Sequence, residues 1–478
     1  MSNQAGATSR RTALKALGAL GTAAAVGSTT NAATSESSQV GAGAAGFRDE
    51  LQRHIQSTPL IDTHEHLPDE DERLRGQFVP CDDWGVLFSH YIDSDLIAAG
   101  MTETDRNQLA GKNIDPIAKW KLLEPFWPAV KNTGYGRAVR IVIQELYGID
   151  ELDDQAIPRL QAGYESVRRP GFYRKILVEL ANIESSQNNY LWKPYKESRQ
   201  PTLLMQDLSI MGMHMGPDLN TLSQAAGKNV RTLSDWHEVI AWWFQKYGPY
   251  ATAVKTQAAY ARGLDFEQIP AEKAEGAFKK ILQKDPITPE ERKLVEDHLF
   301  WYAVEQATQH HLPVKLHTGY YAGQNGMPLG RVAGNPAQAA ELCRKSRNTQ
   351  WIFMHIAYPY WQDLIAVAKH YTNAHIDMCW SWIIDPFAST QFLKSCLMAA
   401  PANKVLVFGG DYIPVECVLG HARIARQGIL RALSELTDEG YLSRKDAMEL
   451  VEMIMRGNAW RIFQVEKKAQ RLRGAPWA

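Results

Sequence analysis

The sequence predicts a parallel α/β fold, a (β/α)8 TIM barrel with a helical insertion between the first and fourth strands. Three observations support this prediction. In the C-terminal half, short apolar runs alternate with helical patterns, as in successive βα units. Side chains that can bind metals follow the ends of several of these runs, where barrel enzymes hold their catalytic groups. The 478 residues, 45% hydrophobic and 22% charged, have the composition of an ordinary folded protein.

The first 33 residues show the order of features that is typical of a twin-arginine export signal. Arg10 and Arg11 precede a small-residue apolar run from Ala16 to Gly27. The alternative interpretation is an Ala-rich disordered terminus with an accidental arginine pair. The run is too short and too rich in Ala and Gly to predict a membrane span. We therefore expect a periplasmic or otherwise exported protein, with no stable membrane insertion of the mature chain.

The rest of the chain is predicted to be a linker and one large domain. Residues 34–46 are rich in Ser, Gly and Ala and indicate the linker, and residues 47–478 hold the barrel. Lys and Arg number 52 against 53 Asp and Glu, which gives no reason to expect nucleic acid as a partner. A small-molecule substrate is the expected partner, and a homo-oligomer stays open. The five cysteines lack paired spacing and predict neither a thiolate zinc site nor a dense disulfide framework.

The secondary structure is predicted as follows. A helix is expected over residues 47–57, and the first strand leads into residues 62–66. Residues 67–250 read as mostly helical, which is long for two βα units and indicates an insertion over the barrel mouth. Strands are expected at 202–205, 251–255, 313–317, 351–355, 374–378 and 405–411, with helices at 294–309, 336–345 and 443–456.

A histidine pair stands at the end of the first strand. Because successive side chains of a strand alternate, Asp62, His64 and His66 share one face, while Thr63 and Glu65 share the other. The two imidazoles converge on the barrel interior, and Asp62 could fix the orientation of a ring from behind. Neutral imidazole is a common zinc ligand. By itself, however, the pair is equally consistent with two surface histidines.

Three further residues of metal-binding type end later apolar runs: His317, His355 and Asp411. Each one alone is explained more simply as a core histidine with satisfied hydrogen bonds or as a helix N-cap. All three together at strand ends would require several coincidences, so the sequence predicts a metal centre in the barrel.

In these residues the chain resembles the amidohydrolase superfamily, and within it the amidohydrolase-2 group that includes FluG-type domains. The likeness is clearest over residues 251–463, at segments 255–264, 317–319, 355–359, 408–411 and 458–463. The resemblance implies a divalent metal held by His64, His66 and His317. It also implies Asp411 as a further ligand, or as the base beside the metal-bound water.

The resemblance suggests a mechanism. One or two ions, expected to be zinc, would activate water and polarise a carbonyl, and Asp411 would pass the water proton to the leaving amine. His355 would stabilise the oxyanion or bind a second metal. Lys255 would be a carbamylated bridging ligand, an ammonium that binds a substrate carboxylate, or part of a structural ion pair. Tyr260 and Arg262 would also bind substrate, since a guanidinium suits a carboxylate, or Arg262 would be a surface or capping charge.

The expected reaction is hydrolysis of an amide or related C–N bond in a small substrate that carries a carboxylate. A decarboxylase or a uronate-type isomerase would use the same barrel and the same ligands. A non-catalytic periplasmic binding protein is the third alternative.

Overall fold

The computed structural model describes residues 46–323 and 327–477, and contacts divide the chain into Met1–Gly46 and Phe47–Ala478. The predicted export signal lies outside the described residues, as does the predicted linker up to residue 45. Residues 46–57 form a helix, as expected from the sequence. Phe47, Leu51 and Ile55 recur at helical spacing, and all three are buried.

The described strands are short, and every paired neighbour is parallel. One sheet holds β1 (Leu60–Glu65), β2 (Ile183–Asn188) and β3 (Leu204–Gln206) in that order. The second sheet holds, in chain order, β4 (Leu208–Ser209), β5 (Val254–Thr256), β6 (Val314–His317), β7 (Trp351–Met354), β8 (Ala374–Asp377) and β9 (Val405–Leu406).

Backbone hydrogen bonds join β3 to β4 as one bent strand. The N–H of Asp207 donates to the carbonyl of Asn188 over 2.9 Å, which continues the β2–β3 pairing. The next N–H, that of Leu208, donates to the carbonyl of Ala253 over 2.9 Å and so begins the pairing with β5. Residues 204–209 therefore change partner in mid-strand and connect the two sheets.

The other junction lies between β1 and the chain that follows β9. The N–H of Thr63 donates to the carbonyl of Phe408 over 3.0 Å, and the N–H of Asp411 donates to the carbonyl of His64 over 2.8 Å. With β3 and β4 counted as one strand, these bonds close a barrel of eight strands. The predicted strand 405–411 is regular only over its first two residues, yet the rest of it still pairs with β1.

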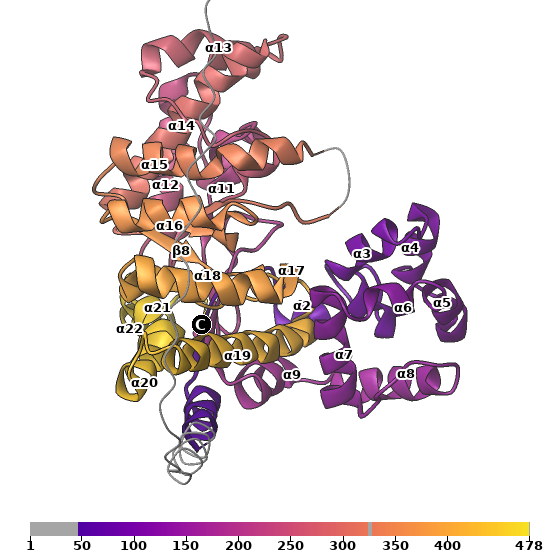
Figure 1. Cartoon of the computed structure of the whole chain (residues 1–478). Coiled ribbons are helices and arrows are strands. Elements are labelled where there is room, and N and C mark those ends of the chain that lie inside the picture. The colour runs from indigo at the N-terminus through magenta and orange to yellow at the C-terminus, as the bar shows by residue number, and fades with distance from the viewer. Residues whose placement is uncertain (1–45, 324–326, 478) are drawn as a thin grey trace, which may run out of the picture. The chain divides into compact units, whose positions relative to one another are not determined.

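The helical insertion lies mainly in the connection from β1 to β2 (Figure 1). This connection holds α2 (Glu70–Leu74), η1 (Trp84–Phe88), α3 (Ile92–Ala98), α4 (Glu103–Leu109), α5 (Pro116–Leu123), α6 (Trp127–Val130), α7 (Gly134–Tyr147), α8 (Ala156–Val167), α9 (Phe172–Arg174) and η2 (Lys175–Leu180). In Figure 1, helices α3 to α8 gather at one side of the barrel. The remaining helices of the predicted region follow β4: α10 (Met211–His214), α11 (Leu219–Ala226) and α12 (Leu233–Tyr247).

Helices also connect the later strands and follow the last one. They are η3 (Ala258–Tyr260), α13 (Ala271–Gln283), α14 (Pro289–Gln309), η4 (Leu329–Gly334), α15 (Asn335–Lys345), η5 (His355–Ala357), α16 (Trp361–His370), α17 (Ser381–Ile384), α18 (Pro386–Ala399), η6 (Ala402–Lys404), α19 (Val415–Asp438), α20 (Arg444–Glu452), η7 (Met453–Gly457), α21 (Asn458–Ile462) and α22 (Val465–Arg473). The three helices expected here are all present. Helix α14 begins five residues earlier than predicted because Thr288 and Glu291 form a capping box around Pro289. Among the described helices, none has both the length and the apolar character that a membrane span requires.

Candidate metal centre

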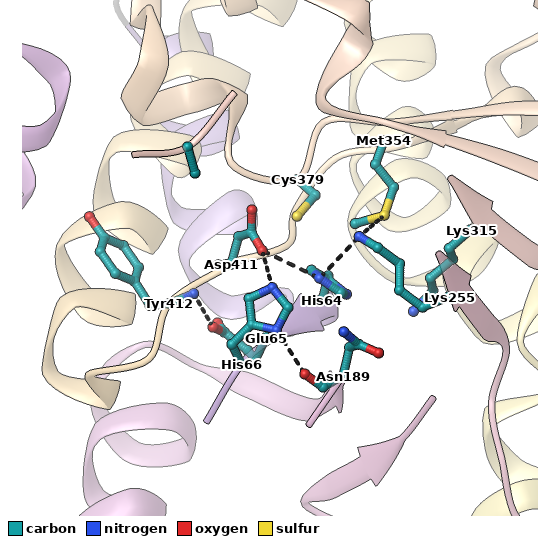
Figure 2. A network of polar contacts seen from close by, with 12 residues as sticks. His64, Glu65, His66, Asn189, Lys255, Lys315, Met354, Cys379, Asp411 and Tyr412 are labelled. Carbon is teal, nitrogen blue, oxygen red and sulfur yellow. Dashed lines mark hydrogen bonds and ion pairs between the residues drawn. The ribbon is translucent and has the colours of Figure 1, made fainter. Parts of the chain in front are cut away.

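Three of the predicted ligands meet where β1 ends beside the chain that follows β9. The Oδ1 atom of Asp411 lies 3.3 Å from Nε2 of His64 and 3.2 Å from Nε2 of His66 (Figure 2). All three residues are buried. We call His64, His66 and Asp411 the first cluster. Asp411 has a backbone φ of +61°, a left-handed conformation that is uncommon for a non-glycine residue and typical of strained functional sites.

The hydrogen bonding of His66 fixes its neutral tautomer. Its Nδ1 atom lies 2.7 Å from the backbone carbonyl oxygen of Asn189. A carbonyl oxygen only accepts, so Nδ1 carries the proton, and Nε2 of the neutral ring keeps its lone pair. That lone pair then faces the carboxylate of Asp411, which also only accepts. A proton or a cation must therefore lie between the two groups.

Asp411 is held as a carboxylate. Burial alone would raise its pKa, but the contact with Nε2 of His66 and the electrostatic effect of the neighbouring His64 and His355 outweigh burial and hold the pKa well below its usual value. Burial lowers the pKa of His64 well below its usual value, and the charge of Lys255 lowers it further. A neutral imidazole next to a carboxylate has the donor chemistry of a zinc site.

The carboxylate behind the ring of His64 is Asp207, not Asp62 as predicted. The Oδ2 atom of Asp207 lies 3.7 Å from Nδ1 of His64. Asp62 instead accepts backbone N–H groups of His64 and Gly410, each over 3.1 Å. The reason is a shift in the register of β1 between Asp62 and Glu65, which interrupts the regular alternation of side chains on which the prediction relied.

His355 also presents a lone pair to Asp411. Its Nδ1 atom lies 2.9 Å from the carbonyl oxygen of Cys379, so Nδ1 carries the proton. Its Nε2 atom lies 4.0 Å from Oδ2 of Asp411 and has no hydrogen-bond partner among the described residues. Burial lowers the pKa of His355 to about 4. The neutral ring has no second N–H for an oxyanion, so this geometry suits a metal ligand better than the oxyanion-stabilising role.

His317 and Tyr260 lie at the same end of the barrel. The ring of His317 lies 4.4 Å from that of His355, and its Nε2 atom lies 2.8 Å from the carbonyl oxygen of Tyr320. In the described part of the chain, His317 does not join the first cluster. The ring of Tyr260 lies 4.5 Å from that of His317, and its hydroxyl accepts the N–H of Ala322 over 3.0 Å.

Lys255 reaches the first cluster. Its Nζ atom lies 3.4 Å from Nε2 of His64 and 3.0 Å from Sδ of Met354. Burial lowers its pKa. Both of these contacts are to neutral groups, and Lys255 forms no ion pair with a carboxylate among the described residues. The structural ion pair considered from the sequence is therefore not formed.

The structure does not bring Arg262 to the first cluster. Its guanidinium pairs with Asp297 at 2.6 Å and with Glu296 at 3.2 Å, and it lies over the ring of Phe266. These contacts already use the charge that was expected to bind a substrate carboxylate. In this arrangement Arg262 joins the segment that follows η3 to helix α14.

Sequence reasoning missed a buried ion pair behind the first cluster. The Nζ atom of Lys315 donates to both carboxylate oxygens of Asp207, at 2.8 and 3.0 Å, and to the side chain of Gln187 at 2.7 Å. Both charged residues are fully buried. A signal was available, because Lys315 interrupts an apolar strand two residues before His317.

An aromatic stack from the insertion borders the site. The ring of Tyr91 packs against those of Trp380 and Tyr135, at centroid distances of 4.8 and 5.4 Å, and these two rings lie 6.4 Å from each other. The ring of Trp380 in turn meets His355 edge-on at 5.4 Å. The insertion therefore supplies part of the wall around the candidate ligands.

Comparison with known proteins identifies a family and one related sequence. A sequence model of the amidohydrolase family matches residues 187–465. Protein fluG of Emericella nidulans is 21% identical over 232 residues, 46% of this chain and 26% of fluG, so the match spans about a quarter of that relative. The family model, in contrast, matches more than half of this chain.

Solved structures share the fold at low sequence identity. Uronate isomerase from Thermotoga maritima has a TM-score of 0.70 at 12% identity, over 87% of this chain and 97% of the isomerase. Glucuronate isomerase from Caulobacter crescentus has a TM-score of 0.70 at 15% identity, over 88% and 95%. A protein of Lactobacillus casei classed as a metal-dependent hydrolase has a TM-score of 0.60 at 14% identity, over 87% and 98%. Together with the matched family model, the barrel and its cluster of histidines and aspartate show that this chain belongs to the amidohydrolase family.

Proposed function

We propose that this chain is a metal-dependent hydrolase that cleaves an amide or related C–N bond in a small, carboxylate-bearing substrate. The observation that carries the proposal is the first cluster, in which two imidazole nitrogens face one carboxylate oxygen at 3.2 and 3.3 Å. Membership of the amidohydrolase family supports the same chemistry. Nitrogen and oxygen donors in this combination suit zinc, which we propose as the metal.

The residues present fit such an ion. His64, His66 and Asp411 would hold it, with His317 and His355 as further ligands for one or two ions. The tautomer of His66 leaves a lone pair directed at the carboxylate, and a cation between them would remove the repulsion of two acceptors. When bound there, a divalent cation lowers the pKa of water and polarises a carbonyl group.

The chain's own residues would then move protons and orient the substrate. Asp411, kept as a carboxylate, can accept the proton of the attacking water and deliver it to the leaving nitrogen. Lys255 has no carboxylate partner among the described residues, so a substrate carboxylate is the partner we propose for it. Tyr260 stands beside His317 and would contact the substrate from that side.

Metal analysis tests the first part of the proposal. Wild-type protein purified without chelators is compared with His64→Ala, Asp411→Asn and the control Asp154→Asn, whose carboxylate pairs with Lys121 at the surface. We expect the first two variants to lose bound zinc, and the control to keep it. If wild type carries no more metal than His64→Ala, the proposed metal centre is wrong.

The reaction is tested with N-acyl and γ-glutamyl compounds in water enriched in oxygen-18. Hydrolysis places the label in the new carboxylate. We expect Asp411→Asn to lower the rate of hydrolysis by about 100-fold or more. Release of carbon dioxide without labelled product would indicate a decarboxylase instead. Isomerisation of a uronate without consumption of water would indicate an isomerase.

We also propose export by the twin-arginine route, on the sequence of residues 1–33 alone. These residues lie outside the described part of the chain. The test replaces Arg10 and Arg11 by Lys together and compares the protein in periplasmic and cytoplasmic fractions. We expect the double variant to stay in the cytoplasm, while Lys15→Arg is exported normally. Equal export of both variants would contradict the proposal.

A further inference from the structure

Two histidines face each other between α12 and α14, the helices that precede β5 and β6 (Figure 1). The Nε2 atom of His237 lies 2.8 Å from Nε2 of His298. Both residues are half-buried, and neither belongs to the first cluster. Neither histidine ends a strand, so the sequence pattern that indicates the first cluster does not reveal this pair.

The hydrogen bonding of His298 leaves its Nε2 atom as an acceptor. Its Nδ1 atom lies 2.8 Å from the carbonyl oxygen of Ile269, which only accepts, so Nδ1 carries the proton. The short contact between the two rings therefore needs either a proton on Nε2 of His237 or a cation between the two nitrogens. Burial lowers the pKa of His237 to about 4, so this ring is neutral at neutral pH, the state in which an imidazole binds metals.

His237 can present a second lone pair without losing its place. No described residue forms a hydrogen bond with its Nδ1 atom, so the ring can carry its proton there and free Nε2. The ring stacks on that of Tyr302, with centroids 4.1 Å apart and planes at 15°. The hydroxyl of Tyr302 donates to the backbone carbonyl of His237 over 3.3 Å. Residues outside the pair therefore hold both imidazoles close together.

We propose that His237 and His298 bind a divalent transition-metal cation, with copper(II) preferred, independently of the first cluster. Two nitrogens about 2.0 Å from one ion are about 2.8 Å apart at neighbouring corners of a square plane, and about 3.3 Å apart at a tetrahedral angle. The observed 2.8 Å matches the square plane, a geometry typical of copper(II) and nickel(II). The ring centroids lie 5.0 Å apart, so the half-buried rings tilt to bring both lone pairs onto one ion. On binding, the proton between the nitrogens moves to Nδ1 of His237, and the pair releases none.

A cavity beside the pair gives an ion access from solvent. Its volume is about 500 Å³, and its lining includes His298, Tyr302 and Glu305. Among the described residues, no third histidine, cysteine or carboxylate has a ligand atom within 4.8 Å of both nitrogens, so water from the cavity completes the coordination. A bound ion would tie α12 to α14 and stabilise the folded chain in proportion to the copper present.

Copper(II) binding tests the pair by difference. Wild type and His237→Gln are dialysed to equilibrium against the same copper(II) concentrations, and the bound copper is counted. We expect wild type to bind one copper ion more than the variant, with the nitrogen hyperfine splitting of two imidazoles in its electron paramagnetic resonance spectrum. Copper at the first cluster is common to both proteins, because the variant leaves that cluster unchanged. Equal copper in the two proteins would overturn the proposal.

Further variants locate the extra ion. His298→Gln should lose it as His237→Gln does, whereas the control His370→Gln, which alters an exposed histidine at the end of α16, should bind copper like wild type. His64→Ala changes the first cluster and should keep the extra copper and its spectrum. Loss of that spectrum in His64→Ala would assign the copper to the first cluster and refute the proposal. Should either glutamine variant fail to fold, a wild-type copper signal without the splitting of two nitrogens would refute it equally.

Discussion

The hydroxyl of Tyr91 donates a hydrogen bond to the backbone carbonyl of Asp411 over 2.6 Å. Tyr91 lies in the insertion just before α3, whereas Asp411 follows the last strand of the barrel. Both residues have a backbone φ of +61°. Such conformations persist only where surrounding contacts enforce them, and here each strained residue holds the other. The insertion therefore fixes the backbone of the central carboxylate of the site.

Replacing Tyr91 by Phe should loosen this backbone. The change leaves a buried carbonyl without its donor, so we expect the free energy of unfolding to fall by about 1–3 kcal/mol and the metal affinity to weaken. Denaturant unfolding and zinc competition measure the two effects. Tyr135→Phe is the control, because its ring belongs to the same stack. Equal losses of metal affinity in both variants would contradict a specific role for Tyr91.

The buried Lys315–Asp207 pair should matter both for stability and for the orientation of His64. Asp207→Leu leaves the Lys315 ammonium without its charge partner, and Lys315→Met does the same to Asp207. We expect each single variant to lose about 3–5 kcal/mol of unfolding free energy. The double variant Asp207→Leu with Lys315→Met should be more stable than either single one. Chemical denaturation of the four proteins completes the cycle.

Metal affinity separates the two roles of this pair. The double variant removes the carboxylate that lies 3.7 Å from Nδ1 of His64, so its zinc affinity should stay about 10–100-fold below wild type even where stability recovers. If zinc affinity recovers together with stability, Asp207 acts only as the ion-pair partner of Lys315 and does not orient His64.

The sequence predicted the later barrel strands well and missed β2, and the reason is physical. Strands β6 to β8 are apolar runs bounded by turns and helices, so hydrophobic patterns reveal them. Strand β2 places Ser185, Ser186, Gln187 and Asn188 in the interior, where Gln187 accepts from Lys315. A strand whose buried side chains are polar shows no hydrophobic periodicity, so sequence patterns do not reveal it.

The candidate site was predictable only in part for a similar reason. His64, His66 and Asp411 stand at strand ends, a position that sequence patterns indicate. The place of Cys379, whose carbonyl accepts from His355, depends on the left-handed turns at Trp380 and His355, with φ of +65° and +64°, which no local pattern predicts for these residues. The insertion likewise meets the site only through tertiary contacts.

Gly410 is required by the packing of Glu65. A Cβ atom at residue 410 would lie 1.8 Å from Oε1 of Glu65, whose other oxygen accepts the N–H of Tyr412 over 2.7 Å. Gly410→Ala should therefore displace Glu65 and cost about 1–3 kcal/mol of unfolding free energy. Gly276→Ala, in α13 with open space around it, should instead stabilise by up to roughly 1 kcal/mol. Similar stabilities for both variants would show that Glu65 can move freely.

Lys468 should make stability depend on pH above neutrality. Its Nζ atom donates to the carbonyls of Gly248 and Pro249, yet burial lowers its pKa to about 7. The unfolded chain, with an ordinary lysine pKa, binds more protons than the folded chain between pH 7 and 10, so this residue makes the unfolding free energy rise with pH. The rise should be about 2 kcal/mol between pH 7 and pH 9. Denaturant unfolding across this range should show the rise in wild type relative to Lys468→Met, which lacks the titrating group. Parallel pH profiles of the two proteins would mean that the two carbonyls keep the ammonium charged in the folded state.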